Sequence, residues 1–439
     1  MSTVMKNADV MVIGAGAAGL MAACTLARAG KKVIVLEACN RTGGRIRTIN
    51  DTMFFEHAEL GAEFVHGNLP LTLQLLHEAN IAYHPAGGEM WQFKNRSFIK
   101  NAGMIEGWDL LMQKLDGLNT DMTLQEFLEA YFAGEEFDQL RESVIRYAEG
   151  YDTSDPARVS MLSLRNEWQN EDEDAQYRIE GGYCRLINYL TGVLKQHESD
   201  IYLNAPVTQI SWQDGHVAAT TDSGDVYEAE KVILAIPLGV WQAPVTAKGY
   251  INFLPAVDAK IAALQKLGFG AVIKVLLQFD NVFWETELTQ STENAQLQNM
   301  AFLFSDEEIP TWWTQTPNHE PLLTGWLGGA PAARLVNTSA EDVLQLALSS
   351  LSIIFNISVG ALKEKLVAWH VANWTADPYI YGSYAYDTID TAAALQILKQ
   401  PVANTVYFAG EFLYQGTAMG TVEAALTSGR DTAHQLLKL

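Results

Sequence analysis

A glycine-rich stretch near the start of the chain constrains its fold more than any other feature. Residues 11–45 read MVIGAGAAGLMAACTLARAGKKVIVLEACNRTGGR. The apolar run over residues 8–13 predicts a buried strand, residues 14–19 a turn, and residues 19–29 a helix. A second apolar strand then ends at Glu37. This order is typical of the first βαβ unit of a dinucleotide-binding α/β domain.

Each residue of this unit has a physical reason to be there. Gly14 allows a tight turn, Gly16 lets the backbone approach a pyrophosphate, and Gly19 lets helix and strand pack closely. The helix N-terminus supplies free N–H groups and the positive end of a dipole. Glu37 can accept hydrogen bonds from both ribose hydroxyls and repels a 2′-phosphate. A purely structural turn is the alternative, but the combination of strand, helix and terminal acid favours dinucleotide binding.

The same stretch raises the question of a membrane segment, because no charged residue lies between Val10 and Ala27. Glycines crowd its first half, Asp9 precedes it, and no signal-peptide cleavage site follows, so we expect neither a signal peptide nor a membrane span.

Three cysteines without metal-site spacing indicate a reducing compartment and no metal site, and we expect a cytoplasmic protein.

Size and charge limit the possible partners. The chain has 439 residues, 48% of them hydrophobic, which is enough for two domains. The formal net charge of −23 argues against nucleic acid or an anionic membrane as partner and favours cationic ligands. A solvated acidic surface that only aids solubility would give the same charge.

The segments that follow predict a discontinuous first domain. Amphipathic helices between residues 104 and 151 are typical of an inserted domain, and the strand-rich stretch after residue 200 returns the chain to the first domain. We expect 7–83, 177–250 and 376–439 to form the dinucleotide-binding domain, and 84–176 and 251–375 to form a substrate-binding domain.

One strand carries an unexpected charge. In GAVIKVLLQF, residues 271, 273, 275 and 277 share one face, whereas Lys274 lies on the other face between Val272 and Leu276. A lysine between aliphatic neighbours is costly unless it is paired or functional. The alternative is an edge strand whose outer face is in water.

Five segments in order resemble one known family: GAGAAG…E…GGR, LGAEF, PVTQI, GAVIK and AGE…GTVEAA. The chain resembles the flavin amine oxidases over nearly its whole length, a family that includes monoamine oxidases, polyamine oxidases and histone lysine demethylases. The resemblance implies an α/β fold with a discontinuous Rossmann-type FAD-binding domain and a mixed α+β substrate-binding domain.

The resemblance also implies a set of cofactor contacts. Gly61 and Ala62 would run past the flavin ring, Val207 would meet the adenine edge through its backbone, and the helix that begins near Gly420 would face the flavin pyrimidine. Ser383 stands where monoamine oxidases carry the cysteine that anchors FAD, so we expect non-covalent FAD. The predicted FAD contacts are Gly14, Gly16, Ala18, Gly19, Glu37, Gly44, Arg45, Gly61, Ala62, Glu63, Val207, Trp374, Glu411, Gly420 and Thr421.

Three residues are expected to act on the substrate or the reacting flavin. Lys274 matches the family lysine that holds a water against flavin N5, and Tyr384 matches the first wall of the aromatic cage around the amine. Thr421 stands where the second cage aromatic is often found, which leaves the cage half built. His66 matches a histidine of polyamine oxidases that contacts the substrate, although a structural histidine is an equal alternative.

The predicted activity is that of an FAD-dependent oxidase of a small-molecule amine, without a metal. Hydride transfer from the α-carbon of a monoamine or polyamine to flavin N5 gives an imine and then an aldehyde, while O2 becomes H2O2. No arginine for a substrate carboxylate can be identified, so amino acids rank lower. The alternatives are a flavin desaturase or porphyrinogen-type oxidase on an apolar substrate, and a flavin-binding scaffold without turnover.

Overall fold

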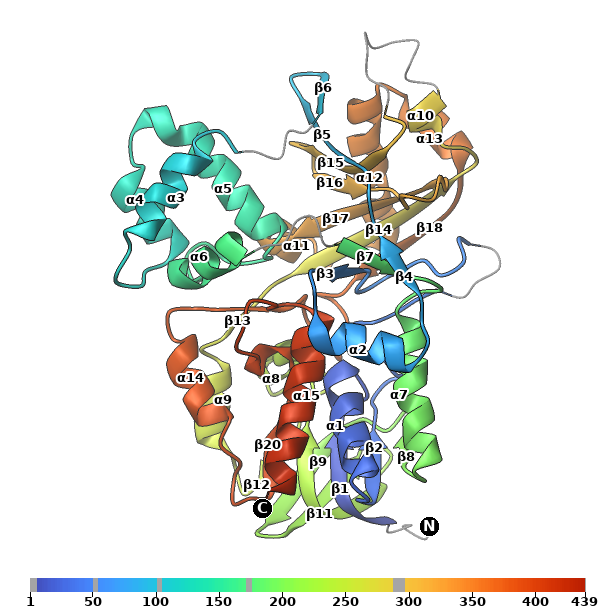
Figure 1. Ribbon diagram of the computed structural model, residues 1–439, viewed down its shortest axis with the longest axis vertical. Coiled ribbons are helices and arrows are strands. Elements are labelled where there is room, and N and C mark those ends of the chain that lie inside the picture. Colours follow the sequence, from blue (N-terminus) through green and yellow to red (C-terminus); the bar gives the residue numbers. More distant parts are fainter. Residues whose placement is uncertain (1–5, 50–53, 101–104, 171–175, 287–296, 439) are drawn as a thin grey trace.

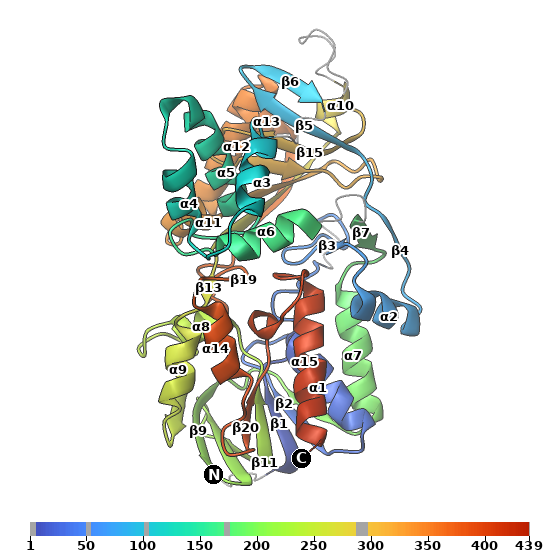
Figure 2. The same ribbon diagram turned by 60° about the vertical axis from the view of Figure 1, so that its left-hand side comes forward.

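The computed structural model describes residues 6–49, 54–100, 105–170, 176–286 and 297–438. Two bodies are stacked along the long axis, each built on one large sheet (Figure 1, Figure 2). A group of helices is attached to the side of the upper body, and both chain ends lie at the far end of the lower body (Figure 1). The two large sheets therefore lie in different bodies.

An eight-stranded sheet forms the frame of the lower body. Its strands follow the order β12-β9-β10-β11-β1-β2-β8, and β20 pairs with β11. β1 is parallel to both β2 and β11, as a βαβ unit requires. The bounds are β1 (Lys6–Ile13), β2 (Val33–Leu36), β8 (Asp200–Tyr202), β9 (Val207–Gln213), β10 (His216–Thr221), β11 (Val226–Leu234), β12 (Asn252–Leu254) and β20 (Val406–Phe408).

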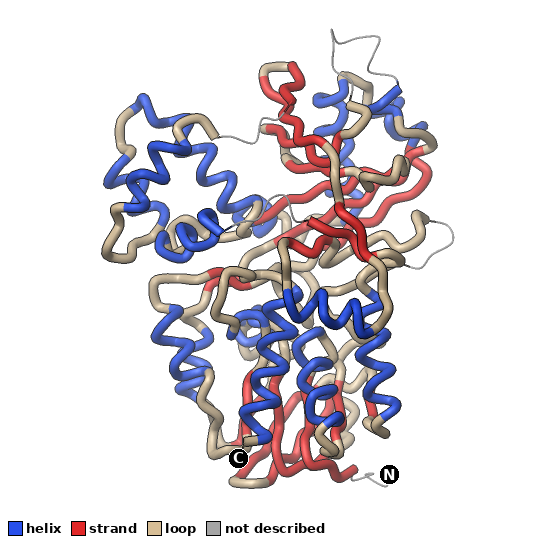
Figure 3. Tube along the Cα trace, in the orientation of Figure 1, coloured by secondary structure: helices blue, strands red, loops and turns tan. Residues whose placement is uncertain are grey.

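Helices cover both faces of this sheet, as the tube in Figure 3 shows. Val10 and Val12 of β1 belong to one apolar cluster, and Met11 and Ile13 belong to another on the opposite face. Burial on both faces explains why β1 reads as a continuous apolar run. The first cluster includes α1 (Ala17–Arg28), α2 (Pro70–Glu78), α7 (Cys184–Gln196) and α15 (Val422–Leu437), and the second includes α8 (Leu238–Gln242), α9 (Asp258–Leu264) and α14 (Thr391–Leu398).

A seven-stranded sheet forms the upper body, in the order β18-β14-β17-β16-β15-β5-β6. β14 lies inside it, antiparallel to both β17 and β18. The strands are β5 (Glu89–Lys94), β6 (Ser97–Lys100), β14 (Val272–Phe279), β15 (Met300–Ser305), β16 (Thr311–Trp313), β17 (Leu322–Gly328) and β18 (Leu366–Asn373). The helices beside it are α10 (Phe283–Thr286), α11 (Gly329–Arg334), α12 (Ala340–Phe355) and α13 (Val359–Lys365).

The remaining elements form the helical group and the junction between the bodies. The helices share their own apolar cluster: α3 (Trp108–Asp116), α4 (Leu124–Tyr131), η1 (Glu135–Phe137), α5 (Asp138–Gly150) and α6 (Met161–Asn170). At the junction lie β3 (Phe64–His66), β4 (Tyr83–Pro85), β7 (Gln176–Ile179), the pair β13 (Gly268–Phe269) and β19 (Ala385–Tyr386), and η3 (Glu411–Leu413).

The predicted fold class is confirmed, and the strands of the lower sheet come from separate stretches of the chain. β12 pairs with β9 in the lower sheet although it lies beyond the predicted boundary at residue 250. The exact domain boundaries stay a prediction. In the described part of the chain no single helix has the length and apolarity to cross a membrane. The helices Ala340–Phe355 and Val359–Lys365 reach that length and apolarity only when they are taken together, and the pair is bent by 109°.

Candidate active site

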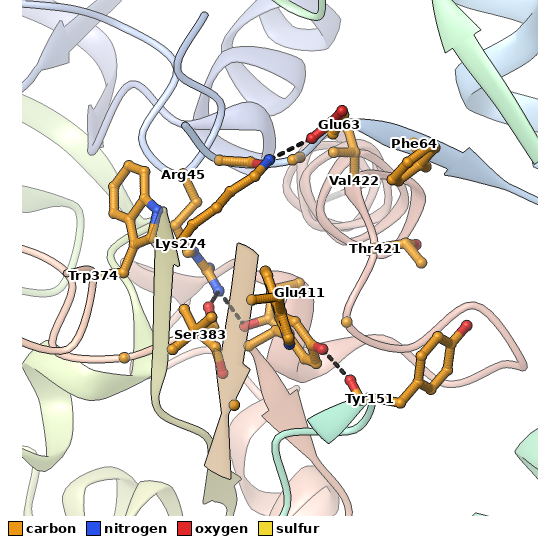
Figure 4. Close-up of a pocket in the computed structure, with 18 of the residues that line it drawn as sticks. Arg45, Glu63, Phe64, Tyr151, Lys274, Trp374, Ser383, Glu411, Thr421 and Val422 are labelled. Atoms are coloured by element: carbon orange, nitrogen blue, oxygen red, sulfur yellow. Dashed lines mark hydrogen bonds and ion pairs between the residues drawn. The ribbon is translucent and has the colours of Figure 1, made fainter. Parts of the chain in front are cut away.

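One cavity of about 1600 Å³ extends between the two bodies. Typical small-molecule pockets measure about 300–1,000 Å³, so this one has room for more than a substrate. Every predicted site residue lines it except Gly19. Residues that lie far apart in the sequence thus surround one space, part of which Figure 4 shows.

At the lower end of the cavity, the first βαβ unit forms a cradle of backbone. Gly14 has a φ of 101°, and a Cβ there would lie 2.6 Å from the carbonyl oxygen of Ala235. Gly16 caps α1 without a side-chain hydrogen bond, so the helix N-terminus offers its N–H groups to the cavity. Gly19 serves packing, because a Cβ at Gly19 would lie 1.9 Å from the oxygen of Gly14.

Glu37 lies at the end of β2 beside this cradle. Its Oε2 accepts a hydrogen bond from the N–H of Ala15 at 2.7 Å, and its Oε1 accepts one from the N–H of Cys39 at 2.9 Å. Burial raises the pKa of Glu37, and the two N–H groups and Arg41 oppose that shift. Each oxygen keeps a further lone pair that a ribose hydroxyl can use.

Arg45 links the two chain segments that meet at the middle of the cavity (Figure 4). Its Nη1 donates to the carbonyl oxygen of Ser383 at 2.6 Å and to Glu411 Oε1 at 3.0 Å. The carboxylate of Glu411 also accepts from the N–H of Ala385. The hydroxyl of Ser383 lies 2.7 Å from the hydroxyl of Thr153. These contacts fix the loop that the resemblance places near the flavin.

Lys274 is completely buried, with 1% of its side chain exposed. The edge-strand alternative is wrong, because β14 lies between β17 and β18. Its Nζ donates to Glu63 Oε2 at 2.6 Å and to the carbonyl oxygen of Gly61 at 3.1 Å (Figure 4). The ring of Trp313 lies 5.2 Å from Nζ. The buried cation is therefore paired, and it also lines the cavity.

Glu63 joins Lys274 to a second cation that sequence reasoning missed. Arg178 Nη1 forms an ion pair with Glu63 Oε1, and the guanidinium also donates to the carbonyl oxygens of Thr314 and Thr316. Burial alone would raise the pKa of Glu63, but Lys274 and Arg178 outweigh it and hold that pKa at about 2. The carboxylate is therefore engaged by protein groups, which leaves its backbone as the predicted cofactor contact.

Tyr384 and Trp374 occupy fixed places in the cavity wall. The hydroxyl of Tyr384 donates to the carbonyl oxygen of Tyr151, and burial, reinforced by Asp152, raises its pKa. Trp374 Nε1 donates to the carbonyl oxygen of Leu60 at 2.8 Å, which holds the Gly61 segment. Thr421 caps α15 by accepting from the N–H of Ala424 at 3.3 Å. Its small side chain does not supply a second cage ring.

His66 lies on β3 beside Phe64, with ring centroids 5.7 Å apart. Burial lowers its pKa to about 4, so the ring is neutral near pH 7. Its Nδ1 is buried and has no hydrogen-bond partner among the described residues. A neutral ring with this pKa is a weak base, which favours a contact role over proton abstraction.

Acidic side chains gather where the helical group and the β15–β16 connection line the cavity. They are Glu106, Glu149, Glu167, Asp306, Glu307 and Glu308, and the lining of the cavity also contains the basic residues Lys94, Lys100, Arg146 and Arg334. Arg146 of α5 forms an ion pair with Asp306 across this end of the cavity. Aromatic residues line the space between this acidic end and Lys274, namely Tyr147, Tyr151, Phe302, Phe304, Trp313, Trp326 and Tyr384.

Comparison with known proteins identifies the class. The family of flavin-containing amine oxidoreductases matches over residues 17–102 and 97–437, and the chain belongs to this family. Human lysine-specific histone demethylase 2 is 27% identical over 443 residues, which cover 92% of this chain and 50% of the human protein. Rice polyamine oxidase 4 is 24% identical over 98% of this chain and 88% of its own length. The chain thus spans about half the length of the human relative.

Solved structures agree on the fold. Putrescine oxidase bound to putrescine superposes with a TM-score of 0.79 at 21% identity, covering 99% of this chain and 100% of that one. Cyclohexylamine oxidase from Brevibacterium oxydans IH-35A gives a TM-score of 0.76 at 20% identity, with 99% of both chains covered.

FAD, the cofactor of this family of oxidoreductases, fits the residues that line the cavity. The glycine cradle would take the pyrophosphate, Glu37 the ribose, and the neighbourhood of Lys274 the flavin.

Proposed function

We propose that the chain is an FAD-dependent amine oxidase that acts on a small monoamine or polyamine. Bound FAD would accept a hydride from the α-carbon of the amine and pass two electrons to O2, which with two protons becomes H2O2. The other product is an imine, which water hydrolyses to an aldehyde and an amine or ammonia. The protein's part is binding, orientation and control of charge.

The observation that carries this proposal is the buried Lys274 ammonium at the cavity wall. A fully buried lysine costs stability unless its charge is used or paired, and here it faces a cavity that also contains Tyr384. A fixed positive charge in a site with little water stabilises negative charge that develops during electron transfer. That property suits an oxidase better than a scaffold.

The cavity also controls the protonation of the substrate. A protonated amine gains energy at the helical end of the cavity, where acidic side chains outnumber basic ones, whereas the positive charge of Lys274 and the aromatic walls disfavour it near Lys274. Only the neutral amine has a lone pair to support hydride loss. The gradient from acidic to cationic surroundings therefore favours proton release before reaction. Tyr384 orients the amine from one side.

The test is peroxide production by purified, FAD-loaded protein over a panel of amines. The panel contains a monoamine, a diamine, polyamines, an amino acid and, because several relatives are named histone demethylases, a peptide with methylated lysine. We expect peroxide with at least one amine. Loss of flavin colour only with a lipophilic donor would instead support a desaturase, and a flavin that no donor bleaches would support a scaffold.

A further inference from the structure

Glu63 lies between two buried cations. Its Oε2 contacts Lys274 Nζ at 2.6 Å, and its Oε1 forms an ion pair with Arg178. The exposed fractions of the Glu63, Lys274 and Arg178 side chains are 5%, 1% and 10%. The triad of two cations and one anion carries one net positive charge, and Glu59, whose pKa burial raises to about 7, is close enough to interact with Lys274 and Glu63. Water contributes little screening here, so the geometry of the three groups determines the field in the cavity.

The contacts of Lys274 leave one direction for its remaining proton. An ammonium has three N–H donors. Of the described residues, only Glu63 and Gly61 accept hydrogen bonds from Nζ, at 2.6 and 3.1 Å. On another side the ring of Trp313 lies under the ammonium, with its centroid 5.2 Å from Nζ, as a cation–π partner. Because Lys274 lines the cavity, the third N–H is left for a group inside it.

We propose that Glu63 is a positioning residue for Lys274. It holds the ammonium by one oxygen so that the third N–H faces the cavity, while Arg178 binds the other oxygen and keeps the carboxylate in place. This inference rests on the proposed function, in which Lys274 acts on the reduced flavin. Glu63 itself needs no contact with substrate.

A purely structural role for the same triad is the competing explanation. Arg178 donates to the carbonyl oxygens of Thr314 and Thr316 beyond β16, so the ion pairs also tie the Gly61 segment to the upper sheet. Removing one partner of a buried ion pair destabilises a protein whatever its function. The two explanations differ in whether the effect of Glu63 depends on Lys274.

A double-mutant cycle separates them. Glu63→Gln, Lys274→Met and the double variant are loaded with FAD, reduced photochemically without any amine, and mixed with O2 in a stopped-flow instrument. The matched control is Glu59→Gln. Glu59 is also buried and interacts with Lys274 through its charge, but its carboxylate accepts hydrogen bonds from Thr48 and from the N–H of Tyr183, so Glu59→Gln tests the loss of a nearby charge without the loss of a hydrogen bond to Nζ. FAD content and thermal unfolding of every variant are measured in parallel.

We expect Glu63→Gln to slow flavin reoxidation by about tenfold to a hundredfold, because a displaced reacting group loses rate on that scale. The double variant should match Lys274→Met within about twofold, and Glu59→Gln should match the wild type. Removing the negative charge should also shift the flavin reduction equilibrium about tenfold towards the reduced form, which is about 30 mV for two electrons.

Two outcomes would overturn the inference while leaving the proposed function intact. In one, Glu63→Gln slows the Lys274→Met variant by the same factor as the wild type, which indicates a structural effect. In the other, reoxidation and potential stay at wild-type values. If Lys274→Met itself leaves reoxidation unchanged, the positioning role fails together with the role of Lys274, and the amine panel then tests the oxidase activity separately.

Discussion

Replacing Arg178 with methionine tests how much the buried ion triad contributes to stability. The pKa of Glu63 lies at about 2 instead of its ordinary 4.5, which corresponds to about 3 kcal/mol of stability at neutral pH, supplied jointly by Lys274 and Arg178. Arg178→Met also leaves the carbonyl oxygens of Thr314 and Thr316 without their donor. We expect the free energy of unfolding to fall by about 3–5 kcal/mol at pH 7.

The pH dependence of that loss has a definite sign. Because the folded-state pKa of Glu63 lies below 4.5, the stability from its ionised form is present above pH 4.5 and is lost as the pH falls towards 2. The gap between wild type and Arg178→Met should therefore shrink by about 1 kcal/mol between pH 7 and pH 3.

The assay is urea unfolding of the apoprotein at pH 7, 5 and 3, followed by tryptophan fluorescence. Arg185→Met is the matched control, because Arg185 is exposed and its guanidinium donates, within the described part of the chain, to no group but the carbonyl oxygen of Glu180. A loss below about 1 kcal/mol at pH 7, as expected for the exposed control, would refute the reasoning. A gap that widens on acidification would contradict the assignment of the charge to Glu63.

Three further predictions address the cofactor site. Glu37→Gln should weaken FAD binding about tenfold, because a charged acceptor for the ribose hydroxyls is lost. Titration of the apoprotein with FAD measures the affinity. An unchanged affinity would exclude a contact between Glu37 and the ribose. Acid precipitation should release all flavin, since Ser383 carries no thiol, and yellow colour retained in the pellet would contradict a non-covalent cofactor. Because the pKa of His66 lies at about 4 in the folded protein, stability is lost as the pH falls below 6.5. His66→Asn should therefore lessen the fall of the unfolding midpoint between pH 6.5 and pH 4. The same pH dependence in the variant and the wild type would contradict a buried neutral ring.

The local parts of the fold could be predicted from the sequence because short-range patterns encode them. The alternation around Lys274 predicted a strand with that lysine between aliphatic neighbours, and Val272 and Leu276 do pack in one cluster beside it. The glycine turn and Glu37 likewise come from one continuous stretch. The strand-rich stretch after residue 200 predicted that the chain returns to the first domain, and β9, β10 and β11 do lie in the same sheet as β1.

The partners of these residues could not be predicted, because they lie far away in the sequence. Arg178 is separated from Glu63 by 115 residues, and nothing around it in QYRIEGG distinguishes it from a surface arginine. Glu423 was missed for the same reason. Its carboxylate accepts from the N–H groups of Leu71 and Thr72, and so caps α2 from a helix 351 residues later. Side-chain bridges between segments become visible only when the topology is known.

The arrangement of charge along the cavity gives a physical reason for burying Lys274. Under the proposed function, the acidic side chains at the helical end of the cavity would hold an amine in its protonated form, since nearby carboxylates favour a cation. Under the same proposal, the buried ammonium of Lys274 would oppose that preference in its own neighbourhood, and the pairing with Glu63 lowers the cost of burying it. The triad keeps one positive charge uncompensated, which is enough to oppose a second cation at short range.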